Sequence, residues 1–217
     1  MKVMAFNGSA RKSWNTATLL SKALEGASAK KASTDLVHLY EVDFKGCISC
    51  FACKTKGGRS YGKCAVKDDL APLLARAAKA DALIIGSPIY FGAVTGVTRS
   101  LIERLCFPFM TYTDPPGSLF PRKIKTALIA TMGAPEEHAR EAGFVQHVAS
   151  AESLLGMIFG ACESLMSFDT YQFEDYSKVV AERFDPEHKA RRRAEIFPKD
   201  CEAAFRLGAR LAKPPSL

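Results

Sequence analysis

The residues between Gly8 and Thr16 form a short polar stretch between an apolar run at residues 3–6 and a helical pattern that begins near Ala17. A strand, a polar loop and a helix in this order point several backbone N–H groups at one place, and the helix start carries a partial positive charge. A phosphate group fits such a place. The candidate ligands are Ser9, Arg11, Ser13, Asn15 and Thr16. The alternative is an ordinary turn in which Asn15 or Thr16 is the N-cap of the helix.

This loop matches neither of two common phosphate-binding motifs. The Gly-Lys-Ser/Thr ending of a nucleotide-binding P-loop is missing, and Gly8 stands alone where a dinucleotide fingerprint has three glycines. The sequence therefore predicts a phosphate site of another type.

A second stretch holds a cluster of thiols. Four of the seven cysteines lie close together in the sequence, at Cys47, Cys50, Cys53 and Cys64. No basic and then apolar leader precedes the first strand, so we expect a cytoplasmic protein, in which such a cluster favours metal or redox chemistry over a disulfide framework. The other three, Cys106, Cys162 and Cys201, lie on apolar or helical stretches and are predicted to be buried thiols.

The composition is that of a globular protein, with 47% apolar and 24% charged residues. No apolar run approaches the roughly 20 residues that a membrane helix needs, so no membrane partner is expected. The net charge of +7 has two local sources, Arg11-Lys12 and residues 189–193. The second predicts a solvated helix face, and because no aromatic residues interleave with it, no nucleic-acid partner is expected.

Apolar runs and helical spacing alternate along the chain. Strands are predicted at residues 2–7, 34–40, 81–86, 124–131 and 162–169, and helices at 16–30, from Asp68-Asp69 as a cap through 78, at 95–105, 141–160 and from 174 onward. Strands joined by helical crossovers predict an α/β fold: a doubly wound, five-stranded parallel sheet of order 2-1-3-4-5 with helices on both faces. We expect one domain over residues 1–217, with a Cys-rich loop at 43–67, a second long loop at 106–122 and a helical C-terminal extension at 174–217. His38 is predicted to be structural.

Ligands of such sheets bind beyond the carboxyl ends of the strands, and the loops after the first, third and fourth strands would meet there. The third-strand loop offers backbone amides beside aromatic rings, and the fourth-strand loop is small enough for a ring to approach. The candidate ring contacts are Pro88, Ile89, Tyr90, Phe91, Gly92, Thr131, Met132 and Gly133. A ligand with a monophosphate at one end and a flat ring at the other fits all three loops, which predicts FMN. Core packing is the alternative for Phe91.

The sequence resembles the NAD(P)H-dependent FMN reductases of the flavodoxin-like fold over most of residues 1–170. The resemblance rests on Gly8-Ser9-Ala10-Arg11 with Asn15-Thr16, on Ser87 to Gly92, and on the segment from Cys47 to Asp69. It implies that the first loop binds the FMN phosphate and that Pro88 to Gly92 line the isoalloxazine ring. It also implies NAD(P)H as electron donor and a homodimer or homotetramer.

The cysteine segment resembles the iron–sulfur flavoprotein branch of that family. The resemblance implies a 4Fe–4S cluster that feeds electrons to FMN, with three thiolates from C-x2-C-x2-C spacing and Cys64 as the fourth ligand. The gap from Cys53 to Cys64 is longer than is usual in that branch. A zinc site, and free thiols or a disulfide pair, are the alternatives.

The leading hypothesis is an FMN-binding oxidoreductase in one of two forms. One is an electron-transfer flavoprotein whose partner is a redox protein, and the other is a reductase of FMN, quinones or similar small molecules. No catalytic residue is assigned, and His138 is predicted to be a surface residue at a helix start. The alternative is a non-catalytic flavodoxin-like binding or signalling module whose basic C-terminal helix docks an acidic partner. An arsenic- or metal-handling oxidoreductase is a third hypothesis.

Overall fold

The computed structural model describes residues 1–213, and residues 214–217 of the predicted extension lie outside the described residues. The strands are β1 (Lys2–Asn7), β2 (Ser33–His38), β3 (Ala82–Tyr90), β4 (Ala93–Val94), β5 (Ile124–Thr131) and β6 (Gly160–Ser167). The helices are α1 (Asn15–Ser28), α2 (Leu70–Ala77), α3 (Gly96–Cys106), α4 (Glu136–Glu141), α5 (Phe144–Phe159), α6 (Pro186–Glu195) and α7 (Phe197–Leu211), with short 3-10 helices η1 (Leu39–Glu41) and η2 (Tyr176–Lys178).

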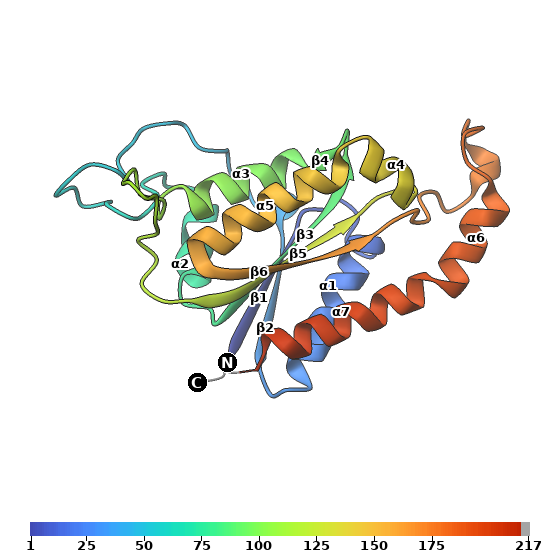
Figure 1. Ribbon diagram of the computed structural model, residues 1–217, viewed down its shortest axis with the longest axis horizontal. Coiled ribbons are helices and arrows are strands. Elements are labelled where there is room, and N and C mark those ends of the chain that lie inside the picture. Colours follow the sequence, from blue (N-terminus) through green and yellow to red (C-terminus); the bar gives the residue numbers. More distant parts are fainter. Residues whose placement is uncertain (214–217) are drawn as a thin grey trace.

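The sheet confirms the predicted fold class (Figure 1). Its five parallel strands run in the order β2-β1-β3-β5-β6, which is the predicted order 2-1-3-4-5. The sequence pattern missed β4, a two-residue strand that pairs antiparallel with the end of β3. It is too short to produce a pattern of its own, so the predicted five-stranded sheet has six strands.

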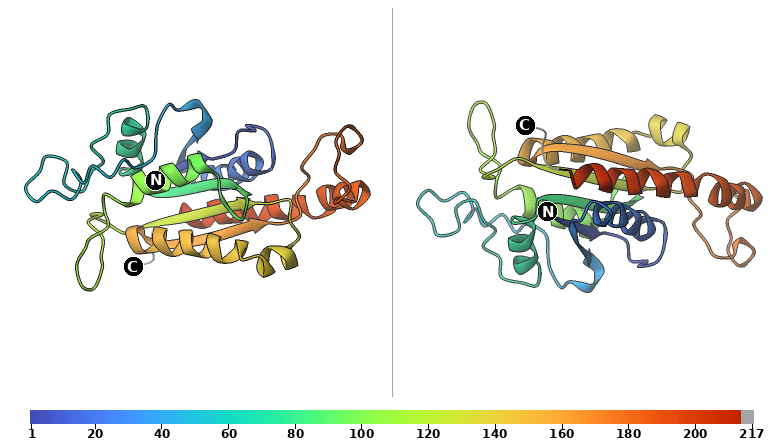
Figure 2. Two further views of the ribbon diagram at one scale, coloured as in Figure 1. Left: turned by 90° about the horizontal axis from the view of Figure 1, so that it is seen from above. Right: turned by 90° about the horizontal axis from the view of Figure 1, so that it is seen from below.

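Helices cover both faces of the sheet (Figure 2). Side chains alternate along β1, so Met4 and Phe6 pack into the core under α2, α3 and α5, while Val3 and Ala5 pack under α1 and α7. All four are fully buried, as expected of a central parallel strand.

The structure differs from the prediction at three places. β3 continues to Tyr90, so much of the expected loop after it is strand. The helix expected at 141–160 is α5, which begins at Phe144, and a short helix that was not predicted, α4, precedes it; Gly143, with a left-handed φ of +78°, lies between the two. The carboxylate of Asp69 makes no capping hydrogen bond to α2, and Asp68 pairs with Arg104 instead.

The C-terminal extension is helical only in part. Residues 168–185 contain η2 and are otherwise irregular, and α6 begins at Pro186 with the Asp185 carboxylate accepting from two backbone N–H groups of its first turn. α7 then packs on α1 at a distance that only glycine allows. A Cβ added to Gly208 would lie 1.7 Å from the carbonyl oxygen of Ala23.

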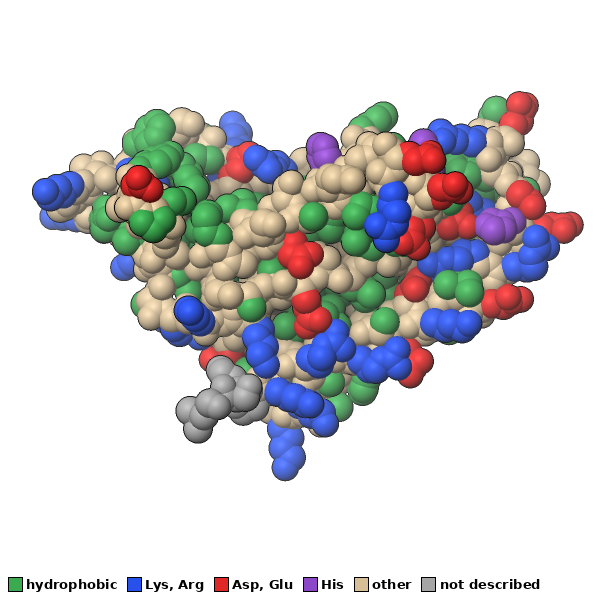
Figure 3. Space-filling model, in the orientation of Figure 1, with side chains coloured by type: hydrophobic (Ala, Val, Ile, Leu, Met, Phe, Trp, Pro, Cys, Tyr) green, Lys and Arg blue, Asp and Glu red, His purple; other side chains and the backbone are tan. Residues whose placement is uncertain are grey.

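The prediction of a solvated basic face at residues 189–193 was wrong in large part. Lys189 is 3% exposed, Arg192 and Arg193 are partly buried, and Arg191 is the exposed one. On the face in Figure 3, Lys and Arg side chains of the extension are interspersed with Asp and Glu. No helix among residues 1–213 is both long enough and apolar enough to cross a membrane.

Candidate functional site

A cleft lies at the carboxyl ends of β1, β3 and β5, where the topology predicts it. Ten of the thirteen predicted cofactor residues line this cleft: Ser9, Arg11, Asn15, Thr16, Pro88, Ile89, Tyr90, Thr131, Met132 and Gly133. Ser13, Phe91 and Gly92 do not line it, and Trp14, Thr170 and Gln172, which were not predicted, do. We refer to it as the flavin cleft, after the ligand that the sequence predicts.

Hydrogen bonds from backbone N–H groups hold the loop between β1 and α1 in place. The N–H of Gly8 donates to the Gly86 carbonyl at 2.7 Å, which ties the loop to β3. The N–H of Ser9 donates to the Asn7 side-chain oxygen at 3.0 Å, and the N–H of Arg11 donates to Ser9 Oγ at 3.1 Å. The loop therefore has a defined shape before any ligand arrives.

The first turn of α1 is open to an anion. The N-cap is Trp14, not Asn15 or Thr16 as the alternative interpretation had it. Within the described residues no side chain caps this helix, and its first turn has no acidic residue. The N–H groups of the turn and the positive end of the helix dipole thus face the cleft without a competing group, which suits a phosphate.

Two threonines join the two ends of the cleft. The hydroxyl groups of Thr16 on α1 and Thr131 on β5 lie 2.7 Å apart and share a hydrogen bond. Both residues are at most 3% exposed. This buried bond fixes the start of α1 relative to the loop that follows β5.

The turn between β3 and β4 corrects one prediction. Phe91 and Gly92 both have a positive φ, +51° and +85°, as the two central residues of a tight hairpin often do. The Phe91 side chain is fully exposed, so the alternative of core packing was wrong. The exposed ring lies at the tip of the hairpin, next to the cleft residue Tyr90.

The residues after β6 form a fourth wall of the cleft. The Thr170 hydroxyl donates to the Met132 carbonyl at 3.1 Å, and the Tyr171 carbonyl accepts from Trp14 Nε1 at 3.0 Å and from Asn15 Nδ2 at 2.8 Å. The Arg11 guanidinium donates to the Gln172 carbonyl at 2.6 Å. The one available signal was positional, since this segment follows the carboxyl end of a parallel strand.

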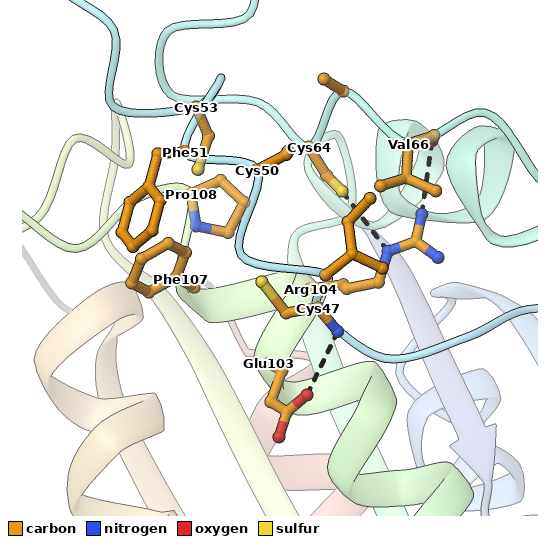
Figure 4. A pocket seen from close by; sticks show the side chains of 12 residues that line it. Cys47, Cys50, Phe51, Cys53, Cys64, Val66, Glu103, Arg104, Phe107 and Pro108 are labelled. Carbon is orange, nitrogen blue, oxygen red and sulfur yellow. Dashed lines mark hydrogen bonds between the residues drawn. The ribbon is translucent and has the colours of Figure 1, made fainter.

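The four clustered cysteines line a second pocket (Figure 4). We call it the thiol pocket, and it is lined by Cys47, Cys50, Cys53 and Cys64 with neighbours from the same loop and from the end of α3. Cys47 and Cys50 are exposed, Cys53 is buried and Cys64 is half-buried. Burial raises the pKa of the Cys53 thiol.

Charged side chains anchor the loop that carries these thiols. Arg104 on α3 is fully buried, pairs with Asp68, and donates from Nε to Cys64 Sγ at 3.4 Å. The hydrogen bond from Arg104 holds the pKa of the Asp68 carboxyl below its usual value. The backbone N–H of Cys47 donates to Glu103 Oε2 at 3.2 Å, and Lys54 Nζ donates to three carbonyls after α3, those of Phe107, Pro108 and Met110.

The two sites lie at opposite ends of α3. The helix begins after Thr95, whose hydroxyl donates to the Gly8 carbonyl at 2.8 Å beside the flavin cleft. It ends with Arg104 and Cys106 next to the thiol pocket. Its 11 residues separate the two sites by roughly 16 Å along the helix axis, at ~1.5 Å per residue.

The remaining cysteines are partly as expected. Cys106 is buried, whereas Cys162 and Cys201 are half-buried. Burial raises the pKa of the Cys106 thiol to about 12 and that of Cys162 to about 11, so both are unreactive protonated thiols at neutral pH. His38 is structural as predicted: its Nδ1 lies 2.9 Å from Asn7 Nδ2.

The profile of the family described as NADPH-dependent FMN reductase matches residues 1–162. The chain belongs to this family. The family that the sequence resembles is thereby confirmed, and the match ends before Thr170 to Gln172, which form the fourth wall of the flavin cleft.

Known relatives agree with this assignment. An iron-sulfur flavoprotein of Archaeoglobus fulgidus is 38% identical over 104 residues, which are 48% of this chain and 48% of the relative. An iron-sulfur flavoprotein of Methanocaldococcus jannaschii is 35% identical over 104 residues, 48% of this chain and 51% of the relative. The chain thus matches about half the length of these curated relatives.

Solved structures share the fold. The NAD(P)H:quinone oxidoreductase from Methanothermobacter marburgensis has a TM-score of 0.70 at 16% identity, over 97% of this chain and 98% of that one. An FMN-dependent NADH-azoreductase from Bacillus anthracis, solved in complex with FMN, has a TM-score of 0.66 at 11% identity, over 98% of this chain and 100% of that one.

Proposed function

We propose that this protein binds FMN in the flavin cleft and acts as a flavin-dependent oxidoreductase that takes electrons from NAD(P)H and passes them to a small molecule such as a flavin or quinone. The observation that carries the proposal is the convergence of three loops on one cleft in a member of the NADPH-dependent FMN reductase family. When bound, FMN supplies both hydride and single-electron chemistry.

The residues of the cleft fit the two ends of FMN. The uncapped start of α1 and the Arg11 guanidinium suit the phosphate. Pro88, Ile89 and Tyr90 offer an apolar wall for the ring, and Gly133 has no side chain to keep the ring from the backbone. The contact between Thr16 and Thr131 keeps the two ends at a constant separation.

An FMN titration followed by flavin fluorescence tests binding, with one site per chain as the expected result. Anaerobic addition of NADPH and, separately, of NADH to the complex then tests electron transfer, with bleaching of the flavin absorbance as the expected result. Failure to bind FMN would refute the proposal and favour a flavodoxin-like binding or signalling module. Binding without bleaching by either nicotinamide would refute the reductase activity alone.

We further propose that the thiol pocket holds a 4Fe–4S cluster on Cys47, Cys50, Cys53 and Cys64. Within residues 1–213, no three His, Cys, Asp or Glu side chains lie close enough together to hold one metal ion. The four thiols instead border a common pocket, and a cluster needs thiolates distributed around a volume because each binds a different iron. The C-x2-C-x2-C spacing and the iron-sulfur flavoproteins among the relatives support a cluster, and a zinc ion is the alternative.

Iron and acid-labile sulfide, measured after anaerobic reconstitution, test the cluster, with about four of each per chain as the content of one 4Fe–4S cluster. Cys64→Ser is expected to lose most of the iron. Cys201→Ser is the matched control because Cys201 lies on α7, away from the pocket. About one zinc and no iron per chain would contradict the cluster.

The assembly and the location of the protein are also proposals. We propose a single folded unit, supported by the packing of α7 on α1. We propose that it forms a homodimer or homotetramer, supported by the exposed rings of Tyr90 and Phe91 on the hairpin, and that it is located in the cytoplasm. Light scattering coupled to size-exclusion chromatography tests the assembly, and a monomer at micromolar concentration would contradict it.

A further inference from the structure

The basic stretch of α6 turns toward the flavin cleft. Lys189 is buried, pairs with Asp169, and donates from Nζ to the Gly133 carbonyl at 2.8 Å. Gly133 lines the cleft. One helix of the extension is therefore attached directly to the loop that follows β5.

Arg193, one turn later on α6, reaches the other end of the cleft. Its Nη1 donates to Asn15 Oδ1 at 2.7 Å, a bond between residues 178 positions apart. Its guanidinium also lies 4.3 Å from the ring centre of Phe197 and 5.7 Å from that of Trp14. Trp14 receives a second guanidinium on its ring, that of Arg11 at 4.0 Å.

Asn15 is the first residue of α1, and residues that follow β6 bind both ends of its side-chain amide. The nitrogen donates to the Tyr171 carbonyl and the oxygen accepts from Arg193. The free N–H groups of this first turn are the groups that a phosphate needs. Arg193 and the Tyr171 carbonyl together hold the Asn15 side chain in one orientation where α1 begins.

We propose that Arg193 is a positioning residue for the phosphate end of the flavin site and contributes to the selection of FMN over riboflavin. It acts through Asn15, whose side-chain oxygen it binds, and through Trp14, against which Arg11 stacks. The proposal rests on the proposed FMN binding. It goes beyond the family match, because Arg193 lies outside the residues that the family profile covers.

The test compares the Kd of FMN and of riboflavin in the wild type and in Arg193→Met, both measured by quenching of flavin fluorescence. Loss of one charge-assisted contact is expected to raise the FMN Kd about ten-fold. The riboflavin Kd is expected to stay within about two-fold, because riboflavin has no phosphate and uses only the ring end of the cleft.

Arg191→Met is the matched control. It removes the same side chain two positions away on α6, where Arg191 is exposed and lies 3.8 Å from the carboxylate of Glu187. Both Kd values are expected to equal those of the wild type. Arg193→Lys retains a charged donor without the guanidinium fork, so its FMN Kd is expected to lie between those of the wild type and Arg193→Met.

The ratio of the two Kd values separates positioning from general support of the fold. If Arg193→Met weakens FMN and riboflavin equally, Arg193 only supports the fold and the proposal fails. If neither Kd changes, the proposal also fails. A wild-type protein that binds no FMN would instead overturn the proposed function, so the two failures are distinguishable.

Discussion

The flavin cleft and the thiol pocket are built in different ways. The cleft lies on strand ends in fixed register, with Asn7 opposite Gly86 and Pro88 opposite Thr131. The thiol pocket lies on residues 42–69, which contain neither helix nor strand and are attached to the end of α3 by a few charged side chains. A sheet distributes its constraint over many backbone hydrogen bonds, whereas the loop depends on a small number of anchors.

The two sites therefore differ in how far their shape depends on a bound ligand. The cleft has its shape without a ligand, because its polar groups are bonded to one another. The thiol pocket is bordered by four thiols on an irregular loop, so a bound cluster would add rigidity to that loop. The two sites should therefore respond independently to mutations in their respective supports.

The largest effect is expected from Arg104→Met, which leaves the Asp68 carboxylate without its partner and removes the donor to Cys64. Breaking a buried ion pair costs about 3–5 kcal/mol, to be measured by urea unfolding. Iron retention should fall, and the Kd of FMN should stay unchanged. Arg206→Met is the control, because its exposed pair with Glu202 contributes about 0.5 kcal/mol. If Arg104→Met also weakens FMN binding, the two sites do not respond independently.

Gly208→Ala is expected to affect the flavin cleft and to leave the thiol pocket unchanged. The new Cβ would meet the Ala23 carbonyl, so α7 must move away from α1, at a cost of about 1–3 kcal/mol in the free energy of unfolding. FMN binding should weaken, because α1 and α6 border or support the cleft, while iron content after reconstitution should not change. Gly96→Ala is the control, since a Cβ there meets nothing within 4 Å. Loss of iron in Gly208→Ala would show that the thiol pocket depends on the extension as well.

A smaller effect is expected from Thr131→Val, which removes the hydroxyl bonded to Thr16 inside the cleft. The lost hydrogen bond should lower the free energy of unfolding by about 1 kcal/mol and weaken FMN binding several-fold. Thr131→Ser keeps the hydroxyl and should bind FMN as the wild type does. Equal behaviour of the two variants would mean that the cleft is not held by this bond.

The smallest effect concerns His38, at the end of β2, before the loop that leads to the thiols. Burial, aided by the positive charge of Lys12, lowers the pKa of His38 in the folded protein. The unfolded chain therefore takes up a proton first as the pH falls below about 6.5, so stability is complete above that pH and decreases below it. His38→Gln should flatten this decrease in urea unfolding between pH 7 and pH 5, whereas a change at the exposed His147 should not. If the free energy of unfolding of His38→Gln decreases with pH as steeply as that of the wild type, His38 is not the source of this pH dependence.

The sequence predicts the sheet and most of the cleft because their signals are local. Apolar runs mark the five long strands, and the helices between them require a parallel sheet. In such a sheet the loops after β1, β3 and β5 meet at one edge, so ten cleft residues can be named before any coordinates are known. The hairpin strand β4, the short helix α4 and the exposure of Phe91 escape prediction, because each is a feature of only a few residues.

The basic stretch on α6 illustrates what a local pattern does not contain. Lys189 to Arg193 has the composition of a solvated surface, and a helix of this sequence alone would be solvated. Three of its cations turn inward because Gly133, Asn15 and Asp200 offer oxygen atoms there. The fourth wall at Thr170 to Gln172 was missed for the same reason, since its contacts lie with residues far away in the sequence.

The sequence by itself thus determined the order of the elements, the family resemblance, the three loops of the flavin cleft and the presence of four clustered thiols. The tertiary structure was needed to show that Thr170 and Gln172 line the cleft, that side chains of α6 bind residues of the cleft, and that the thiols lie at the far end of α3. The physical reason is the range of the interactions. Periodicity and turn chemistry act over a few residues, whereas the bond between Arg193 and Asn15 joins positions 178 apart.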